Sequence, residues 1–198
     1  VKLSHCIDFY RQHHLPCLFR ITPFSQPGNL DGELAAANFG AHQDTRVMSV
    51  ALSEIVPSAP PETAQSVNAE RFATVFCELH GLDAAKAHAE RERYVRAAGR
   101  SVFVVRRDGD APIACGSLAL EGKLAGIFGM VTAVEHRGRG IASGIVAKLL
   151  HEARAAGAET AYLQVEADNT AARRAYSKFG FKDCYAYWYR APPEERSL

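Results

Sequence analysis

Hydrophobic residues in the middle of the chain are concentrated in three short neighbouring segments. These segments are 101–107, 112–120 and 124–132, and short turns at 108–110 and 121–123 separate them. Short apolar segments between turns are typical of β-strands, and side chains alternate between the two faces within 112–120. Connections this short permit only antiparallel pairing. The pattern therefore predicts an antiparallel meander of three strands.

A helix and another strand follow the meander. Apolar residues recur at the spacing of one helical face within 141–156, and 161–165 is a short apolar segment. A helix between two strands provides a crossover to a parallel neighbour. We therefore predict an α/β fold with a mixed sheet, in which an antiparallel meander is followed by a β-α-β crossover.

The order of elements near the N-terminus resembles the order near the C-terminus. We predict helix 5–14, strand 17–21, short helix 30–39 and strand 45–52, to be compared with helix 141–156, strand 161–165, short helix 169–179 and strand 181–189. Asn38-Phe39-Gly40 aligns with Lys178-Phe179-Gly180, and Leu34 stands where the C-terminal copy has Tyr176. Such self-similarity predicts a degenerate, inert half-unit at 1–52. The alternative is an accidental match, since this order of elements is common.

A segment rich in proline, 53–61, separates this half-unit from the rest of the chain. We interpret it as a linker that precedes a second domain at 62–198. Pro61-Glu62 has the residue types that favour a helix start, which predicts a helix ending at Gly81. A second helix is expected over Asp83–Ala98.

Composition limits the classes of function. The chain has 198 residues, 47% apolar residues and a net charge of +1. A net charge this small produces no overall electrostatic field that would attract nucleic acid or a membrane surface. Five scattered cysteines argue against a disulfide framework and favour a reducing, cytoplasmic compartment. No signal peptide is visible, although the sequence begins with Val1. Cys6, His13, His14 and Cys17 lie close in sequence but lack paired metal-ligand spacing, so no metal site is expected.

A basic, glycine-containing turn connects the third strand of the meander to the helix at 141–156. It reads Glu135-His136-Arg137-Gly138-Arg139-Gly140. A helix N-terminus offers unpaired N–H groups and a positive dipole end, both of which favour an anion. Gly138 and Gly140 allow close approach of the backbone, and the two arginines match phosphate oxygens. The turn therefore predicts a diphosphate-binding site.

These residues also resemble a family. Arg137-x-x-Gly140-x-Ala142 is similar to the pyrophosphate-binding loop of the GNAT superfamily of N-acetyltransferases, arginine/glutamine-x-x-glycine-x-glycine/alanine. A second segment, from Asn169 through Tyr176 to Gly180-Phe181, is similar to the family's asparagine-x-x-alanine-x-x-x-tyrosine-x-x-x-glycine-phenylalanine block. The two blocks occur at the expected separation, and the resemblance covers about residues 62 to 190.

The resemblance implies an acetyl-CoA-dependent N-acetyltransferase. It implies a sheet splayed between 124–132 and 161–165, where the pantetheine arm of acetyl-CoA lies. Asn169 would bond the pantetheine amide, and Tyr176 would protonate the leaving thiolate of CoA in a direct attack on the thioester. The residues implied in binding the cofactor are Met130, Val131, Thr132, Arg137, Gly138, Arg139, Gly140, Ile141, Ala142, Ser143, Asn169, Ala172 and Tyr176.

Several alternatives stay open at this point. Gly138-x-Gly140 imitates a dinucleotide-binding fingerprint, but its third glycine, Gly144, comes one position late. Tyr176 could be a half-buried aromatic residue, and the domain could bind CoA without turnover. The acceptor would be a small-molecule amine or a protein amine, and a homodimer is possible. The general base could be Glu78, His80, Glu121, Glu166 or a water chain.

Overall fold

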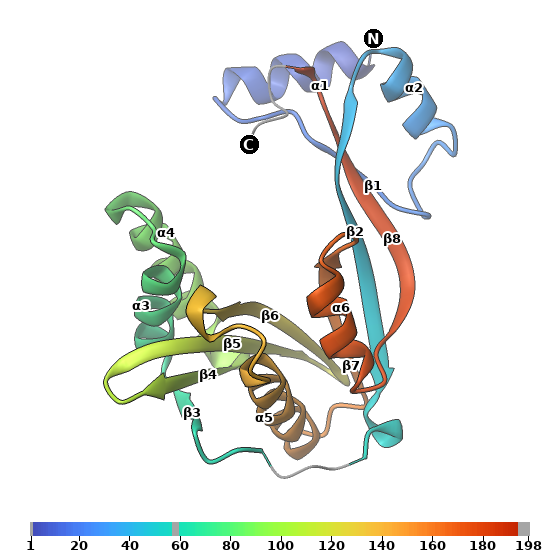
Figure 1. Ribbon diagram of the computed structural model, residues 1–198. Coiled ribbons are helices and arrows are strands. Elements are labelled where there is room, and N and C mark those ends of the chain that lie inside the picture. Colours follow the sequence, from blue (N-terminus) through green and yellow to red (C-terminus); the bar gives the residue numbers. More distant parts are fainter. Residues whose placement is uncertain (1, 57–59, 194–198) are drawn as a thin grey trace. The chain divides into compact units, whose positions relative to one another are not determined.

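The computed structural model of the protein describes residues 2–56 and 60–193. Within them, eight strands form a mixed sheet in the order β1-β8-β2-β7-β6-β5-β4-β3 (Figure 1). The strands are β1 (Phe19–Ile21), β2 (Gly40–Ala51), β3 (Ala64–Val67), β4 (Ser101–Asp108), β5 (Ala111–Glu121), β6 (Leu124–Thr132), β7 (Thr160–Glu166) and β8 (Lys182–Ala191). The helices are α1 (Lys2–Gln12), α2 (Leu30–Ala36), α3 (Ala69–His80), α4 (Ala84–Ala97), α5 (Ile141–Ala155) and α6 (Thr170–Ser177), with short 3-10 helices η1 (Leu52–Glu54), η2 (Ala98–Arg100) and η3 (Val134–His136). The predicted mixed α/β fold is confirmed.

Contacts divide the chain into two compact units. Unit 1 takes in the described residues up to Val47, Val165–Thr170 and the described residues from Asp183 onward. Unit 2 takes in Met48–Gln164, apart from 57–59, and Ala171–Lys182. The predicted half-unit at 1–52, with its linker at 53–61, stays a prediction, and residues 57–59 of that linker lie outside the described residues.

The sheet of unit 2 contains the predicted meander and crossover. β4 pairs with β5, and β5 with β6, in antiparallel register. β6 then pairs with β7 in parallel, after the chain has crossed over through α5. The short turns therefore predicted the strand directions correctly, because they leave no room for any other connection.

The helix predicted to begin at Pro61-Glu62 is wrong in its first half. Residues Ala64–Val67 form β3, which pairs with β4 from Ala64↔Arg106 to Val67↔Phe103. The helix begins only at Ala69, where the Asn68 side chain accepts a hydrogen bond from the backbone N–H of Arg71. Pairing with a strand distant in sequence decides the conformation here, whereas Gly81 ends the helix as expected, with a left-handed φ of 60°.

Helices cover the two faces of the meander (Figure 1). On one face, α3 and α4 pack over a core centred on aromatic rings and on Cys115. This core contains Ala69, Phe72, Ala73, Val75, Tyr94, Phe103, Val105 and Cys115. Adjacent strand residues point to opposite faces, so Gly116 faces away from the core that contains Cys115. A side chain at Gly116 would meet Met130 of β6 and Ile145 of α5. α5 therefore packs on the opposite face.

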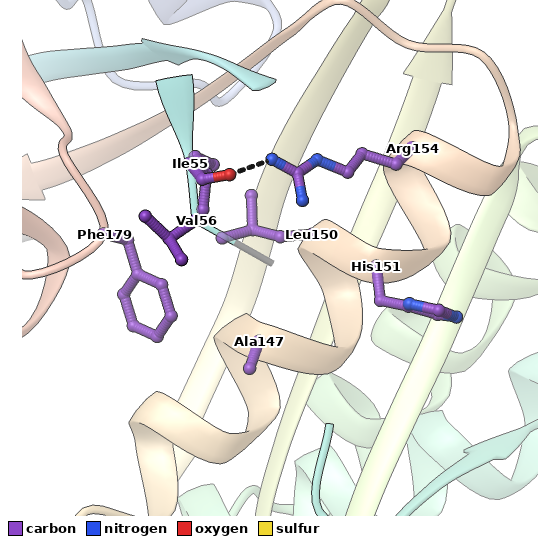
Figure 2. A pocket seen from close by; sticks show the side chains of 7 residues that line it. All are labelled: Ile55, Val56, Ala147, Leu150, His151, Arg154 and Phe179. Carbon is purple, nitrogen blue, oxygen red and sulfur yellow. Dashed lines mark hydrogen bonds between the residues drawn. The ribbon is translucent and has the colours of Figure 1, made fainter. Parts of the chain in front are cut away.

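Arg154, in the last turn of α5, connects this helix to the segment after β2. Its guanidinium donates hydrogen bonds to the backbone carbonyls of Leu52 and Ile55. Figure 2 shows the small pocket beside this contact, which Ala147, Leu150, His151 and Phe179 help to line. Ala147, the lining residue of α5 nearest to Gly140, is separated from it by seven residues, or about 10 Å of helix. The pocket is therefore distinct from the predicted diphosphate site.

Unit 1 has its own small core. Ile21, Leu34 and Phe39 are buried in it, and Leu3, Ile7, Phe19, Leu30 and Trp188 pack against them. Beside this core, Asp31 accepts a hydrogen bond from Trp188 Nε1 at 2.7 Å and two from the Arg190 guanidinium at 2.8 and 2.9 Å. Arg190 also donates to the carbonyl of Phe39 at 3.1 Å. This cluster connects α2 to β8.

Replacement of the carboxylate in this cluster should give a stability difference that depends on pH. The hydrogen bond from Arg190, and to a smaller extent that from Trp188, hold the pKa of Asp31 below its usual value, against the opposing effect of burial. A lowered pKa stabilises the fold above the unfolded pKa of about 3.9, and this stabilisation is lost as the pH falls through the native pKa. We expect Asp31→Asn to lower the thermal midpoint at pH 7, with a difference from wild type that shrinks on acidification. A difference that does not change with pH would show that the charge of Asp31 contributes nothing.

Candidate functional site

The predicted anion-binding turn forms an uncapped helix N-terminus. α3 and α4 begin with Asn68 and Asp83, whose side chains accept hydrogen bonds from backbone N–H groups. α5 begins with Gly140, which has a left-handed φ of 75° and no side-chain cap. The first N–H groups of α5 are therefore available to a ligand.

The two glycines of the turn leave room for that ligand. Gly138 and Gly140 both have positive φ, 76° and 75°, and a Cβ atom added to either would meet no atom within 4 Å. Open space in front of free N–H groups is the arrangement expected for a diphosphate. Arg137 and Arg139 are exposed beside this space, and Arg137 Nε donates to the carbonyl of Thr132 at 3.2 Å. The residues present therefore fit the diphosphate of acetyl-CoA.

The structure also confirms the predicted splay between β6 and β7. The parallel pairing runs from Leu124↔Thr160 only to Ile127↔Leu163, although β6 continues to Thr132. The edge of β6 that faces β7 is therefore unpaired with it over residues 128–132. Met130, Val131 and Thr132, the residues expected to contact pantetheine, lie in this stretch and are partly exposed.

A β-bulge interrupts β6 beside the splay. Cys115 pairs with Val131 and Ser117 pairs with Phe128, so Gly116 alone lies opposite Gly129 and Met130. Gly129 adopts a left-handed φ of 59°, which glycine tolerates and other residues rarely adopt. Bulges re-aim the backbone and often occur beside active sites. Sequence analysis missed this bulge, although an isolated glycine within an apolar strand is the signal that could have indicated it.

Side chains from α4 and β5 surround the bulge. A Cβ atom on Gly129 would lie 2.8 Å from the Tyr94 hydroxyl and 3.4 Å from Ser117 Oγ. Ser117 donates a hydrogen bond to the carbonyl of Phe128 at 3.0 Å. Cys115 is fully buried, and burial raises the pKa of its thiol to about 12. The thiol is therefore not a nucleophile at neutral pH, in agreement with its interpretation as a core residue.

Tyr176 lies on α6 in unit 2 and is 9% exposed. Its ring packs edge-on against Phe181 with the centroids 6.1 Å apart. Burial raises the pKa of its phenol, so the hydroxyl keeps its proton at neutral pH. A buried, protonated phenol is chemically suited to donate a proton to a thiolate.

The other predicted site residues are distributed between the two units. Ile141, Ala142, Ser143 and Ala172 belong to unit 2, together with the glycine turn, whereas Asn169 belongs to unit 1. The expected contact of Asn169 with pantetheine therefore stays a prediction. Ile141 is buried, and Ala142 and Ser143 are partly exposed in the first turn of α5.

The candidate general bases are scattered. Glu78 and His80 are exposed near the end of α3, where the His80 ring lies 4.3 Å from that of Phe76. Glu121 pairs with Leu124 at the turn between β5 and β6, so it lies four residues, or about 13 Å, along β5 from Ser117 at the bulge. Glu166 is exposed and belongs to unit 1. Glu78 and His80 are thus the candidates on the helix layer that covers the bulge.

No group of three or more His, Cys, Asp or Glu side chains in residues 2–56 and 60–193 is arranged to hold a metal ion. In the same part of the chain, no helix is both long and apolar enough to span a membrane.

The site thus has three features: an uncapped helix after a basic glycine turn, a splayed parallel strand pair and a bulged central strand. The sequence model of the Acetyltransferase (GNAT) family matches residues 67–181. The chain therefore belongs to the GNAT family of acetyltransferases, as the two sequence blocks predicted.

Individual relatives agree with this assignment. The chain is 26% identical over 187 residues to an uncharacterized N-acetyltransferase, YobR, from Bacillus subtilis, and the match covers 92% of this chain and 75% of YobR. Among solved structures, a GCN5-related N-acetyltransferase from Kribbella flavida is 15% identical with a TM-score of 0.65, covering 96% of this chain and 74% of its own. A tandem GNAT protein from the clavulanic acid biosynthesis pathway is 17% identical with a TM-score of 0.68, covering 96% of this chain and 69% of its own. At these identities the structural matches show the fold alone.

Proposed function

We propose that this protein transfers an acetyl group from acetyl-CoA to a primary amine. The observation that carries the proposal is the N-terminus of α5, where uncapped N–H groups face open space between two left-handed glycines and two arginines. A predicted acetyltransferase from Clostridium acetobutylicum, whose structure was solved with acetyl-CoA, shares this fold with a TM-score of 0.52, covering 61% of this chain and 89% of its own at 18% identity. The acceptor in this proposal is a small-molecule amine or a protein amine.

The proposed reaction is a direct attack on the thioester. The neutral amine nitrogen bonds to the carbonyl carbon, and the electron pair of the C=O bond moves onto oxygen, where backbone N–H groups of the bulged β6 stabilise it. The C–S bond then breaks as the C=O bond re-forms. Tyr176 gives its proton to the departing sulfur, and the proton lost by the nitrogen restores the phenol through water. Holding both reactants at the splay supplies the orientation.

Calorimetric titration of the purified protein with acetyl-CoA, with NADPH as the control ligand, tests the cofactor site. We expect saturable binding of acetyl-CoA and none of NADPH, because the turn fits a diphosphate but precedes a single crossover. Binding of NADPH alone would favour the dinucleotide alternative, and binding of neither ligand would contradict the proposal.

Turnover is then tested by detecting free thiol in the presence of acetyl-CoA and a panel of amines. The panel contains a polyamine, an arylalkylamine, an aminoglycoside, a free amino acid and a lysine peptide. Release of CoA that depends on one amine class would identify the acceptor chemistry. Tight binding of acetyl-CoA without thiol release for any class would favour a CoA-binding module without turnover.

A further inference from the structure

Tyr94 has a buried hydroxyl group that the packing of unit 2 does not require. It is the only buried residue of α4, with 4% of its surface exposed. Its ring packs against those of Phe72, Phe76 and Phe103, with centroids 4.7, 5.4 and 5.9 Å away. Its hydroxyl oxygen is buried, and among the residues that the structure describes no acceptor lies within hydrogen-bond distance of its proton; the nearby Arg93 guanidinium can only donate. A phenylalanine would fill the same space without leaving a polar atom unsatisfied.

The ring of Tyr94 is held so that this hydroxyl points at the β6 bulge. Arg93 lies over the face of the ring, with its guanidinium carbon 4.2 Å from the centroid, and forms an ion pair with Glu90 at 2.5 Å. The hydroxyl lies against Gly129, only 2.8 Å from the position that a Cβ atom would occupy there. A side chain at 129 would therefore collide with the hydroxyl, and glycine is required by this contact as well as by its φ.

The hydroxyl is a hydrogen-bond donor over the whole range of ordinary assay conditions. Burial raises the pKa of Tyr94 to about 12, although the adjacent Arg93 acts in the opposite direction. Ser117, the other hydroxyl beside the bulge, already donates to the carbonyl of Phe128. Tyr94 thus supplies the one uncommitted donor that the described residues place against Gly129.

We infer that the Tyr94 hydroxyl donates a hydrogen bond to the acetyl carbonyl oxygen of acetyl-CoA bound at the β6 bulge. The inference rests on the proposed function, and it adds a side-chain donor to the backbone donors of β6. In the reaction this hydrogen bond strengthens as negative charge develops on the oxygen, and no proton is transferred through Tyr94. In the unliganded protein the proton of this hydroxyl has no acceptor, because the acceptor belongs to the ligand.

Comparison of acetyl-CoA with CoA as ligands tests the inference without knowledge of the acceptor. Calorimetry on wild type and Tyr94→Phe gives the ratio of Kd for CoA to Kd for acetyl-CoA. We expect Tyr94→Phe to lower this ratio about threefold to tenfold, the effect of one neutral hydrogen bond, with the Kd for CoA unchanged within about twofold. With carbon-13 in the acetyl carbonyl, the infrared band of the bound thioester should lie at higher frequency in the variant.

The thermal midpoint of the unliganded protein separates this role from a structural one. Tyr94→Phe should not lower it, because the proton of the hydroxyl has no acceptor to lose. Tyr187→Phe is the matched control, since Tyr187 is also buried, at 6% exposed, and also lies under an arginine, Arg20, at 3.7 Å. The proposal gives Tyr187 no role toward the acetyl group, so the ligand ratio should not change in this variant.

The failures of the two proposals are distinguishable. If wild type binds both ligands and Tyr94→Phe has the same ratio and the same infrared band, the role of Tyr94 is refuted while the cofactor site stands. A lowered thermal midpoint with an unchanged ratio would show a purely structural hydroxyl. If wild type binds neither CoA nor acetyl-CoA, the proposed function fails and the role of Tyr94 fails with it.

Discussion

Gly140→Val should abolish measurable binding of acetyl-CoA, with a loss of affinity of at least about 100-fold, or roughly 3 kcal/mol. Two effects add. A β-branched residue is strongly disfavoured at the left-handed φ of 75° that Gly140 adopts, and its methyl groups would occupy the open space in front of the first N–H groups of α5. Because no atom lies within 4 Å of a Cβ atom at this position, we expect the variant to fold. Calorimetric titration with acetyl-CoA measures the loss.

A glycine at the other end of the same helix provides the matched control. Gly157 follows α5, has a left-handed φ of 78°, and also has no atom within 4 Å of an added Cβ. Gly157→Val should lower the free energy of unfolding by about 1–3 kcal/mol because of the backbone strain, as Gly140→Val should. Unlike Gly140→Val, it should leave the affinity for acetyl-CoA unchanged. Equal binding by the two variants would mean that the turn at Gly140 does not hold the diphosphate.

Tyr176→Phe should lower kcat by about 10²-fold to 10⁴-fold, the usual contribution of a general acid, while the Kd for acetyl-CoA changes less than about twofold. The reason is that the phenol acts only as the C–S bond breaks, so its loss affects the transition state and not the bound cofactor. The measurement is steady-state thiol release with an amine that supports turnover, together with calorimetry. A weaker Kd with unchanged kcat would contradict the acid role.

The pH profile of wild type gives an independent check on the same residue. A general acid must be protonated, so activity should fall as the pH rises through the pKa of Tyr176. Burial raises that pKa above the ordinary value of about 10, so the midpoint of this alkaline decrease should lie above pH 10. An alkaline decrease centred well below pH 10 that is absent in Tyr176→Phe would require a phenol with a lowered pKa, which the burial of Tyr176 does not explain.

The parts of the fold that sequence could predict are those determined by local chemistry. The turns at 108–110 and 121–123 are so short that the directions of β4, β5 and β6 follow directly, and Gly81 and Gly140 mark helix ends through their own backbone freedom. β3 could not be predicted in the same way. Pro61-Glu62 has the local character of a helix start, and only pairing with β4, about forty residues later, makes Ala64–Val67 a strand.

In the candidate site, too, the residues that sequence could predict are those that belong to a local pattern. The diphosphate turn and Tyr176 were predicted because their residue types occur at a fixed spacing in sequence. Tyr94 was not predicted, since it lies on a helix whose other residues are mostly exposed, 35 positions before Gly129. Nothing in the local sequence connects position 94 to position 129. Their contact depends on how α4 packs over the meander, which is a property of the folded unit.

The missing cap of α5 connects the order of this helix to the binding of a ligand. A helix that begins without a side-chain cap has a first turn that is easily frayed, and a diphosphate at Gly140 would supply the acceptors that Asn68 and Asp83 supply to α3 and α4. The ligand then completes the secondary structure, and helix formation and ligand occupancy become one linked equilibrium. A chain with a diphosphate ligand bound at Gly140 would thus be a more ordered molecule than the purified chain in buffer.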